Sequence, residues 1–213
     1  MKLLYGTTNQ AKLISMQRVT KKIGVEIFGL NDLYKIPEFQ NIQLPDVDET
    51  GKNPLENATI KAKAYYELLK IPVFSCDTGL YFEDIDEKDQ PGTHIRRVNG
   101  KTLTDLEALE YYSNLATSYG GKIKGKYKNA ICLIIDDKNI FSSMDSSLEI
   151  KPFYLVNKAH PKMIKGYPLD SLSVDIKTGK YYNDLEDELA VDKSTIEIGF
   201  TNFFEKAISQ ITR

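Results

Sequence analysis

The spacing of hydrophobic and polar positions changes twice along the first thirty residues. An apolar-rich run at 2–7 is typical of a buried strand, and 25–30 repeats that pattern. Between the two runs, Asn9 stands where a helix cap is expected. The apolar residues that follow it at helical spacing are Leu13, Met16, Val19 and Ile23. The chain therefore opens as strand, helix and strand, which indicates an α/β protein.

A second helix has the clearest start signal in the chain. Asn53 can cap it, Pro54 suits its first position and Glu56 suits its third. Its apolar stripe consists of Leu55, Ala58, Ala62, Tyr65 and Leu69. A short apolar strand at 73–76 then runs into Asp77. We therefore expect this carboxylate at the carboxyl end of a strand, where α/β proteins often bind ligands.

The rest of the chain predicts two more helices and a hairpin. The expected elements are a loop at 83–99, a helix marked by Leu106, Leu109, Tyr112 and Ala116, a hairpin of 127–136 and 139–149, and a last helix at about 202–211 with Phe200, Phe204, Ala207 and Ile211 on one side. Segment 151–192 has no clear periodicity. Because no repeat or linker interrupts the chain, we predict a single α/β domain at 1–213.

Composition then narrows the classes of function. The 213 residues carry a formal net charge of −2, which argues against a protein that holds nucleic acid through its phosphate backbone. No run approaches the roughly 18 apolar residues of a membrane span. No leader-like apolar segment opens the chain, so we expect a cytoplasmic protein without a membrane partner. Cys76 and Cys132 lie in apolar, strand-like runs, and we expect both to be buried free thiols.

The first polar segment with chemical promise follows the first strand. Thr7, Thr8, Asn9 and Lys12 stand where a strand passes into a helix. Free backbone N–H groups, the positive end of the helix dipole and a lysine all favour a phosphate group there. Taken alone, the segment favours the alternative of a helix cap followed by a solvated lysine.

The second polar segment is an acidic loop at 46–51 that contains Glu49. Carboxylates crowded in a loop repel one another unless a cation lies among them, and Mg²⁺ is a hard cation that prefers oxygen ligands. The helix after this loop places Asn57 and Lys61 on one face, because they are four residues apart. The alternative for this segment is a solvated acidic loop.

The third segment joins Asp77 and Thr78 to a glycine, and the alternative for it is an ordinary turn. A later turn at 91–97 delivers Arg96 and Arg97, whose planar guanidinium groups suit phosphate. The alternative there is a solvated basic loop.

In their order and spacing these motifs resemble those of the inosine triphosphate pyrophosphatase family, which removes deaminated purine nucleotides. The residues that carry the resemblance are Thr7, Asn9 and Lys12; Glu49, Thr50 and Gly51; Glu56, Asn57, Ala58, Lys61 and Ala62; Asp77, Thr78, Gly79 and Leu80; and Pro91, Gly92 and Arg97. The resemblance implies a mixed, twisted central β-sheet flanked by helices, with a cleft between two lobes. It also implies a homodimer, for which Tyr111–Tyr112 or Phe203–Phe204 are candidate interface residues.

The resemblance is weaker in the second half of the chain. The family's Phe-Gly-Tyr-Asp segment is reduced here to Gly166 and Tyr167, and Lys193 is a candidate phosphate ligand. The family's Ser-His-Arg motif, which helps to read the purine base, is absent, and 197–199 occupies its place. Cys76 stands where the family commonly has another acid. These departures put the base specificity in doubt more than the hydrolytic centre.

Together the residues and the resemblance predict a Mg²⁺-dependent nucleoside triphosphate pyrophosphohydrolase that acts on ITP, dITP or XTP. Asp77 is the candidate general base, and Glu49 and Asp77 are the candidate metal ligands. The candidate substrate-binding residues are Thr7, Thr8, Asn9, Lys12, Asn57, Lys61, Thr78, Arg97, Tyr167 and Lys193. Three alternatives stay open: a nucleotide-binding homologue that has lost turnover, the same reaction on a different modified nucleotide, and a purely structural interaction protein.

Overall fold

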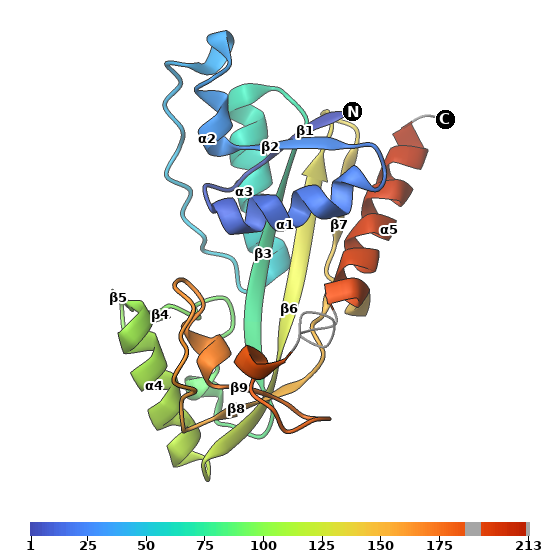
Figure 1. The fold of residues 1–213 in the computed structure, drawn as a ribbon. Helices are drawn as coiled ribbons and strands as arrows, with labels where there is room; N and C mark the ends of the chain where they lie inside the picture. Colours follow the sequence, from blue (N-terminus) through green and yellow to red (C-terminus); the bar gives the residue numbers. More distant parts are fainter. Residues whose placement is uncertain (186–192, 212–213) are drawn as a thin grey trace. The chain divides into compact units, whose positions relative to one another are not determined.

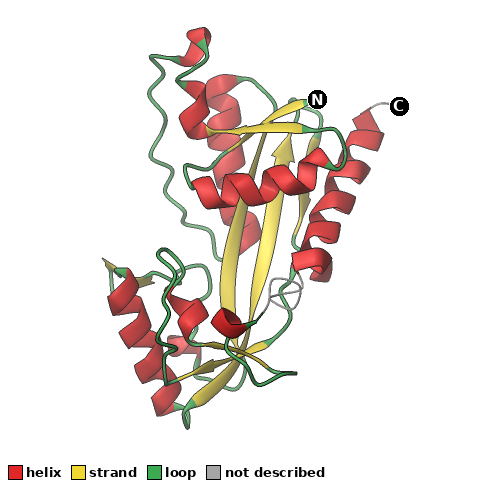
Figure 2. Cartoon of the chain, in the orientation of Figure 1, coloured by secondary structure: helices red, strands yellow, loops and turns green. Residues whose placement is uncertain are grey.

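The computed structural model describes residues 1–185 and 193–211, and the chain forms two compact units. Unit 1 consists of Met1–Thr78, Asn129–Leu148 and Thr195–Arg213, and unit 2 consists of Gly79–Lys128 and Glu149–Ser194. Figure 1 labels the helices and strands in chain order, and Figure 2 colours them by type. The single domain expected at 1–213 stays a prediction.

Unit 1 is built on a mixed sheet with the strand order β2-β1-β3-β6-β7. Its strands are β1 (Lys2–Tyr5), β2 (Glu26–Gly29), the first part of β3 (Val73–Phe82), the second part of β6 (Lys122–Ile134) and β7 (Ile140–Ser143). Strand β1 pairs in parallel with both β2 and β3, whereas β6 and β7 form the predicted antiparallel hairpin. Parallel β1 and β3 bring the segments that follow Tyr5 and Phe74 to the same region of the sheet.

Unit 1 contains four helices in the described part of the chain. They are α1 (Gln10–Lys21), α2 (Leu30–Leu33), α3 (Pro54–Leu69) and α5 (Lys193–Ile211). Two of them, α1 and α3, begin where the sequence predicts caps. The side chain of Asn9 accepts hydrogen bonds from the backbone N–H groups of Ala11 and Lys12. The side chain of Asn53 accepts one from the N–H of Glu56. Each of these caps stabilises its helix by about 1 kcal/mol.

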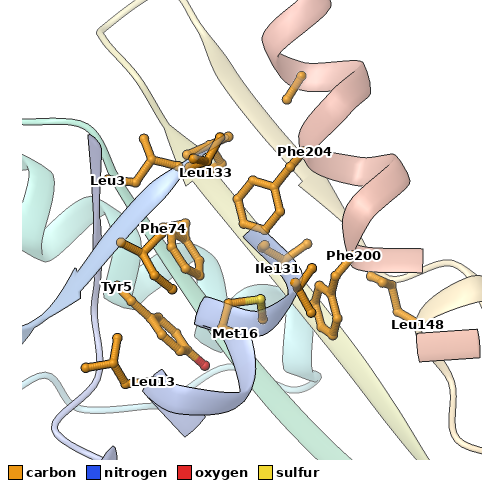
Figure 3. Close-up of a cluster of buried hydrophobic side chains, with 14 residues drawn as sticks. Leu3, Tyr5, Leu13, Met16, Phe74, Ile131, Leu133, Leu148, Phe200 and Phe204 are labelled. Atoms are coloured by element: carbon orange, nitrogen blue, oxygen red, sulfur yellow. The ribbon is translucent and has the colours of Figure 1, made fainter. Parts of the chain in front are cut away.

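Both faces of the unit 1 sheet are covered. On one face, Leu13 of α1 and Phe204 of α5 pack with Phe74 and Leu133 of the strands, as Figure 3 shows. On the other face, α3 packs its alanines and Tyr65 against the opposite side chains of the same strands. Fully burying a side chain such as Phe204 contributes about 1.5–3 kcal/mol. This packing fixes β3 between two helical layers.

Unit 2 contains the remaining parts of β3 and β6 together with the segments that join and follow them. Its other elements are β4 (Arg97–Val98), β5 (Lys101–Thr102), α4 (Asp105–Ser118), β8 (Phe153–Val156) and β9 (Ser173–Asp175). Thr104 and Glu107 form a capping box at the start of α4. Phe82, Tyr112 and Phe153 lie in the buried cluster of this unit. Short 3₁₀ turns at Pro37–Phe39, Glu87–Asp89, Ser146–Leu148, Pro168–Ser171 and Tyr182–Asp184 complete the two units.

Three predictions about elements are wrong. The strand expected at 73–76 continues to Phe82, and the last helix begins at Lys193 instead of about 202. The described part of segment 151–192, for which the sequence predicted no element, contains β8 and β9. Leu106, expected in the stripe of α4, is 68% exposed because it lies off the buried face of the helix, which carries Ala108, Tyr112, Leu115 and Ala116.

Two of the four aromatic residues proposed for a dimer interface lie in the cores instead. Tyr112 and Phe204 are fully buried within their own units. Tyr111 and Phe203 are partly buried against the same clusters. All four side chains therefore pack within their own units. The homodimer itself stays a prediction.

Candidate active site

Asp77 lies in the middle of β3. We had expected it at the carboxyl end of the strand, and that prediction is wrong. Its residue surface is 8% exposed. Because side chains alternate along a strand, Asp77 shares a face with Val73, which packs in the cluster of α3. Strand β3 therefore presents a buried carboxylate to helix α3, and the turn that we had considered at this position does not exist.

Two polar side chains on one face of helix α3 contact this carboxylate. The amide nitrogen of Asn57 donates a 3.1 Å hydrogen bond to Oδ2 of Asp77. One turn later, Nζ of Lys61 lies 3.1 Å from Oδ1 of Asp77. Both oxygens of Asp77 are thus engaged by residues four apart on the same helix, as the spacing predicted.

The acidic loop contributes a second carboxylate to the same ammonium group. Oε2 of Glu49 lies 2.9 Å from Nζ of Lys61. The side chain of Lys61 is 13% exposed and that of Asp77 is 12% exposed. The acids at 49 and 77 therefore converge on one cation, which in this structure is the ammonium group of Lys61.

Burial and charge shift the pKa values within this cluster. Loss of hydration raises the pKa of Asp77 above its ordinary value, although Lys61 and the hydrogen bond from Asn57 oppose the shift. Burial disfavours the charged form of Lys61, but the attraction of Asp77 and Glu49 outweighs it and raises the pKa of the ammonium group. Asp77 is consequently a stronger base than an exposed aspartate.

The loop that carries Glu49 is held to the start of α3. The backbone N–H of Gly51 donates a 2.7 Å hydrogen bond to Oδ1 of Asn57. The N–H of Lys52 donates a 2.7 Å hydrogen bond to Oε2 of Glu56. A Cβ atom on Gly51 would lie 2.6 Å from Oδ1 of Asn57, so the contact requires glycine. These contacts fix the acidic loop against the helix that carries Lys61.

The donor set of this cluster fits Mg²⁺. Within residues 1–185 and 193–211, no three His, Cys, Asp or Glu side chains gather closely enough to enclose a metal ion. Mg²⁺ seldom uses such a cage, because it usually binds one or two carboxylates together with water and substrate phosphates. Glu49 and Asp77, already drawn to a common positive charge, supply the two carboxylates.

The segment after β1 keeps its predicted geometry. The φ angle of Thr8 is in the ordinary negative range, so its Cβ atom is tolerated at the turn. The side-chain oxygen of Asn9 accepts the hydrogen bonds of the helix cap. The hydroxyl oxygen of Thr7 accepts a hydrogen bond from the N–H of Asn9. Lys12 is exposed in the first turn of α1, near enough to Cys76 for its charge to favour the thiolate.

Two neighbours of Asp77 in β3 point away from it. The hydroxyl group of Thr78 donates a 2.8 Å hydrogen bond to Oδ1 of Asn129, which holds β3 to β6. Cys76 packs against the cluster on the face opposite α3, and burial raises the pKa of its thiol to about 12. Both cysteines are free, as predicted. The structure therefore gives Thr78 a bonding role inside the sheet, in addition to the substrate contact that we had predicted.

Unit 2 contains two of the remaining predicted ligands. Arg97 is exposed in β4, and Tyr167 is 43% exposed directly after Gly166. Their two loops are joined through Asp105, whose Oδ2 accepts the N–H of Gly166 at 2.8 Å. The other oxygen of Asp105 lies 2.5 Å from the guanidinium group of Arg96. Asp105 was not among the predicted site residues, because an acid at the first position of a helix looks like an ordinary partner of the helix dipole.

Lys193, the last predicted ligand, begins α5, and its side chain lies outside the described part of the structure. The nearby segment 197–199, which replaces the family's Ser-His-Arg motif, is helical. Glu197 forms a 2.8 Å ion pair with Lys22. Gly199 packs so closely on the backbone of Ser147 that a Cβ atom would lie 2.2 Å from its carbonyl oxygen. This segment therefore packs α5 against unit 1.

Comparison with known proteins agrees with these observations. The model of the Ham1 family matches residues 3–147. This range includes Glu49, Lys61 and Asp77, and also the segment Thr7–Lys12 between β1 and α1. The chain belongs to the Ham1 family. The resemblance drawn from the sequence is thereby confirmed.

Relatives of this Ham1 family member carry one recurring name. A dITP/XTP pyrophosphatase from Leptospira interrogans is 26% identical over 188 residues, which is 87% of this chain and 86% of the relative. Another from Aquifex aeolicus is 38% identical over 97 residues, which is 46% of this chain and only 42% of that protein.

Solved structures agree on the fold of the Ham1 chain. The Ham1 protein of Staphylococcus aureus superposes with a TM-score of 0.72 at 18% identity, covering 97% of this chain and 99% of its own. A HAM1 protein from Coxiella burnetii gives the same TM-score at 17% identity, with both chains fully covered. The predicted class, a mixed α/β fold with a central sheet flanked by helices, is confirmed. None of the helices in the described part of the chain combines the length and hydrophobicity needed to cross a lipid bilayer.

Proposed function

We propose that this Ham1 family member is a Mg²⁺-dependent nucleoside triphosphate pyrophosphohydrolase, which releases a nucleoside monophosphate and pyrophosphate from deaminated purine nucleotides such as ITP, dITP and XTP. The observation that carries the proposal is the convergence of Glu49 and Asp77 on the single positive charge of Lys61. The name shared by its curated relatives, dITP/XTP pyrophosphatase, supports the substrate class.

Asp77 is suited to act as the general base. Water attacks the α-phosphorus of the nucleotide, and Asp77 accepts the proton that this water loses. Its raised pKa brings the carboxylate closer to neutral pH, where a base is most effective. Asn57 and Lys61 hold its two oxygens in fixed directions. Mg²⁺, when held by Glu49 and Asp77, supplies neutralisation of phosphate charge and orientation of the attacking water.

The cations of unit 1 offset the charge of the triphosphate. Positioning and charge neutralisation account for most of the catalysis of phosphoryl transfer. Lys61 lies beside both carboxylates, and Lys12 stands in the first turn of α1. Thr7, Thr8 and Asn9 add hydroxyl and amide groups at the positive end of that helix. For the base and the remaining phosphate charge we propose Arg97, Tyr167 and Lys193.

A panel of nucleotides tests this proposal. Pyrophosphate release is measured with Mg²⁺ for ITP, dITP, XTP, ATP, GTP and dUTP, and the Asp77→Asn variant serves as the blank. We expect turnover of the deaminated purines to exceed that of ATP and GTP. Equal rates for wild type and Asp77→Asn on every nucleotide would overturn the proposal and favour a binding homologue without turnover.

One observation favours a second substrate class on the same centre. The segment at the place of the Ser-His-Arg motif is used to pack α5, through Glu197 and Gly199. The described part of the chain thus lacks the family's base-reading motif at that place. A preference for dUTP or another modified nucleotide in the panel would indicate that this member reads a different base.

A further inference from the structure

We infer that Asn57 is a positioning residue that sets the separation of the two metal-binding carboxylates, and not a ligand of the nucleotide as its sequence motif had led us to expect. This inference rests on the proposed function of Glu49 and Asp77. It assigns to Asn57, together with Gly51, a structural clasp between the acidic loop and strand β3.

Both the oxygen and the nitrogen of the Asn57 side-chain amide form hydrogen bonds within the protein. Its oxygen accepts the N–H of Gly51 at 2.7 Å, and its nitrogen donates to Oδ2 of Asp77 at 3.1 Å. The orientation of the amide is unambiguous, because a backbone N–H can only donate and a carboxylate can only accept. Asn57 is 1% exposed, so its side chain has almost no surface to offer to a nucleotide.

The clasp connects the loop that carries Glu49 to the strand that carries Asp77. Gly51 is two residues after Glu49, and Asp77 is the other candidate metal ligand. The two carboxylates come from segments far apart in sequence, a loop and a strand. Asn57 joins the backbone of the loop to the carboxylate of Asp77, whereas Lys61 contacts both carboxylates and no backbone group of the loop in the hydrogen bonds of this structure. Lys61 therefore balances the charge, and Asn57 fixes the distance.

The contact between Gly51 and Asn57 leaves no room for an additional carbon atom. A Cβ atom on Gly51 would lie 2.6 Å from Oδ1 of Asn57 and 2.8 Å from its backbone nitrogen. The loop can reach the helix this closely only with glycine. Removing the amide would leave the N–H of Gly51 and Oδ2 of Asp77 without this hydrogen bond in a buried place, which is costly. Groups that orient metal ligands typically change metal affinity by about 10–100-fold when they are lost.

The experiment measures binding of Mn²⁺, as a probe for Mg²⁺, to the nucleotide-free full chain by electron paramagnetic resonance. We expect Asn57→Ala to bind Mn²⁺ about 10–100-fold more weakly than wild type. We expect a similar loss for Gly51→Ala, which breaks the same clasp from the loop side and leaves Asn57 intact. Circular dichroism checks that each variant is folded, and two independent variants keep the test valid if one of them is not.

The matched control is Asn53→Ala, which removes an asparagine from the same helix, one turn earlier. The side chain of Asn53 accepts the N–H of Glu56 as a helix cap and donates to Oε1 of Glu56, and none of its hydrogen bonds in this structure reaches Gly51 or Asp77. We expect this variant to lose stability while its Mn²⁺ affinity stays within threefold of wild type. An equal loss of affinity in Asn53→Ala and Asn57→Ala would overturn the inference, because weakening of the helix would then explain both.

The failure of the inference and the failure of the proposed function give different results. Wild-type protein that neither binds Mn²⁺ nor releases pyrophosphate from any nucleotide overturns the proposed function. Wild-type protein that does both, alongside an Asn57→Ala or Gly51→Ala variant with unchanged Mn²⁺ affinity, overturns only the positioning role.

Discussion

Two polar clusters of this protein use the same chemistry in different surroundings. In unit 1, Asp77 meets a lysine and an amide, and in unit 2, Asp105 meets Arg96 and a backbone N–H. The side chains of Lys61 and Asp77 are 13% and 12% exposed, whereas those of Arg96 and Asp105 are 37% and 22% exposed.

The pKa values of the two carboxylates move in opposite directions as a result. Burial raises the pKa of Asp77. The hydrogen bond from Gly166 and that from Arg96 lower the pKa of Asp105. Hydration therefore decides whether a paired aspartate becomes a base or an anchor. A base that is buried beside a cation suits catalysis, and an anchor that is always charged suits the joining of two loops.

The largest expected difference between the clusters is in turnover. Asp77→Asn should lower pyrophosphate release by about 10²–10⁴-fold, because the general base is lost, and metal binding should weaken as well. Asp105→Asn should keep the rate at saturating substrate within about tenfold. Initial rates with ITP and Mg²⁺ measure both variants. Comparable rates for the two would contradict the assignment of the base.

Stability should separate the clusters next. Lys61→Met leaves two carboxylates uncompensated around a buried position and should lower the free energy of unfolding by about 3 kcal/mol. Arg96→Met, in the more exposed cluster, should cost about 1 kcal/mol or less. Urea unfolding at neutral pH gives both values. Added Mg²⁺ should restore part of the loss in Lys61→Met, because a ligand of the folded state stabilises it. Equal losses in the two variants would show that burial does not distinguish the clusters.

A smaller effect is expected when the anchor of unit 2 is removed. Asp105→Ala frees the loop of Gly166 and Tyr167, which holds a proposed contact with the nucleotide. KM for ITP should rise several-fold while kcat changes little, because the proposed hydrolytic centre is in unit 1. Steady-state kinetics test this, and Lys101→Ala, which removes an exposed ion pair with Glu107 nearby, is the control. A fall in kcat with unchanged KM would argue against a binding role for this loop.

The smallest effect is the dependence of stability on pH. The folded-state pKa of Asp77 is raised, so between pH 3.8 and that raised value the folded protein holds more protons than the unfolded chain. The contribution of Asp77 to stability should therefore fall as pH rises through this interval. The folded-state pKa of Asp105 is lowered, so its contribution is present above pH 3.8 and is lost as pH falls through the folded value. Urea unfolding of wild type, Asp77→Asn and Asp105→Asn across pH 3–7 should give difference curves of opposite slope, on opposite sides of about pH 3.8. Parallel curves would contradict the two shifts.

Local signals predicted the elements of the site better than their lengths. The caps at Asn9 and Asn53 and the stripe of α3 are visible in the sequence because they depend on neighbours within one turn. The full length of β3 is not visible, since the polar run after Cys76 looks like a turn when read alone. Pairing within the sheet overrides that local preference and keeps Asp77 inside the strand.

The sequence by itself determined the candidates for the reacting groups. Glu49, Lys61 and Asp77 were chosen from their spacing and motifs, and all three lie within residues 3–147, which the Ham1 family model matches. The sequence also determined the common helix face of Asn57 and Lys61, because helix geometry alone places residues four apart together.

Only the tertiary structure decided how these groups are used. It showed that Asn57 faces a carboxylate and a loop instead of solvent, and that Asp105 joins two loops of unit 2. It also decided which aspartate is buried, and with that the direction of each pKa shift. The physical reason is that hydration and contacts between distant segments depend on packing in three dimensions, and no local sequence pattern encodes them.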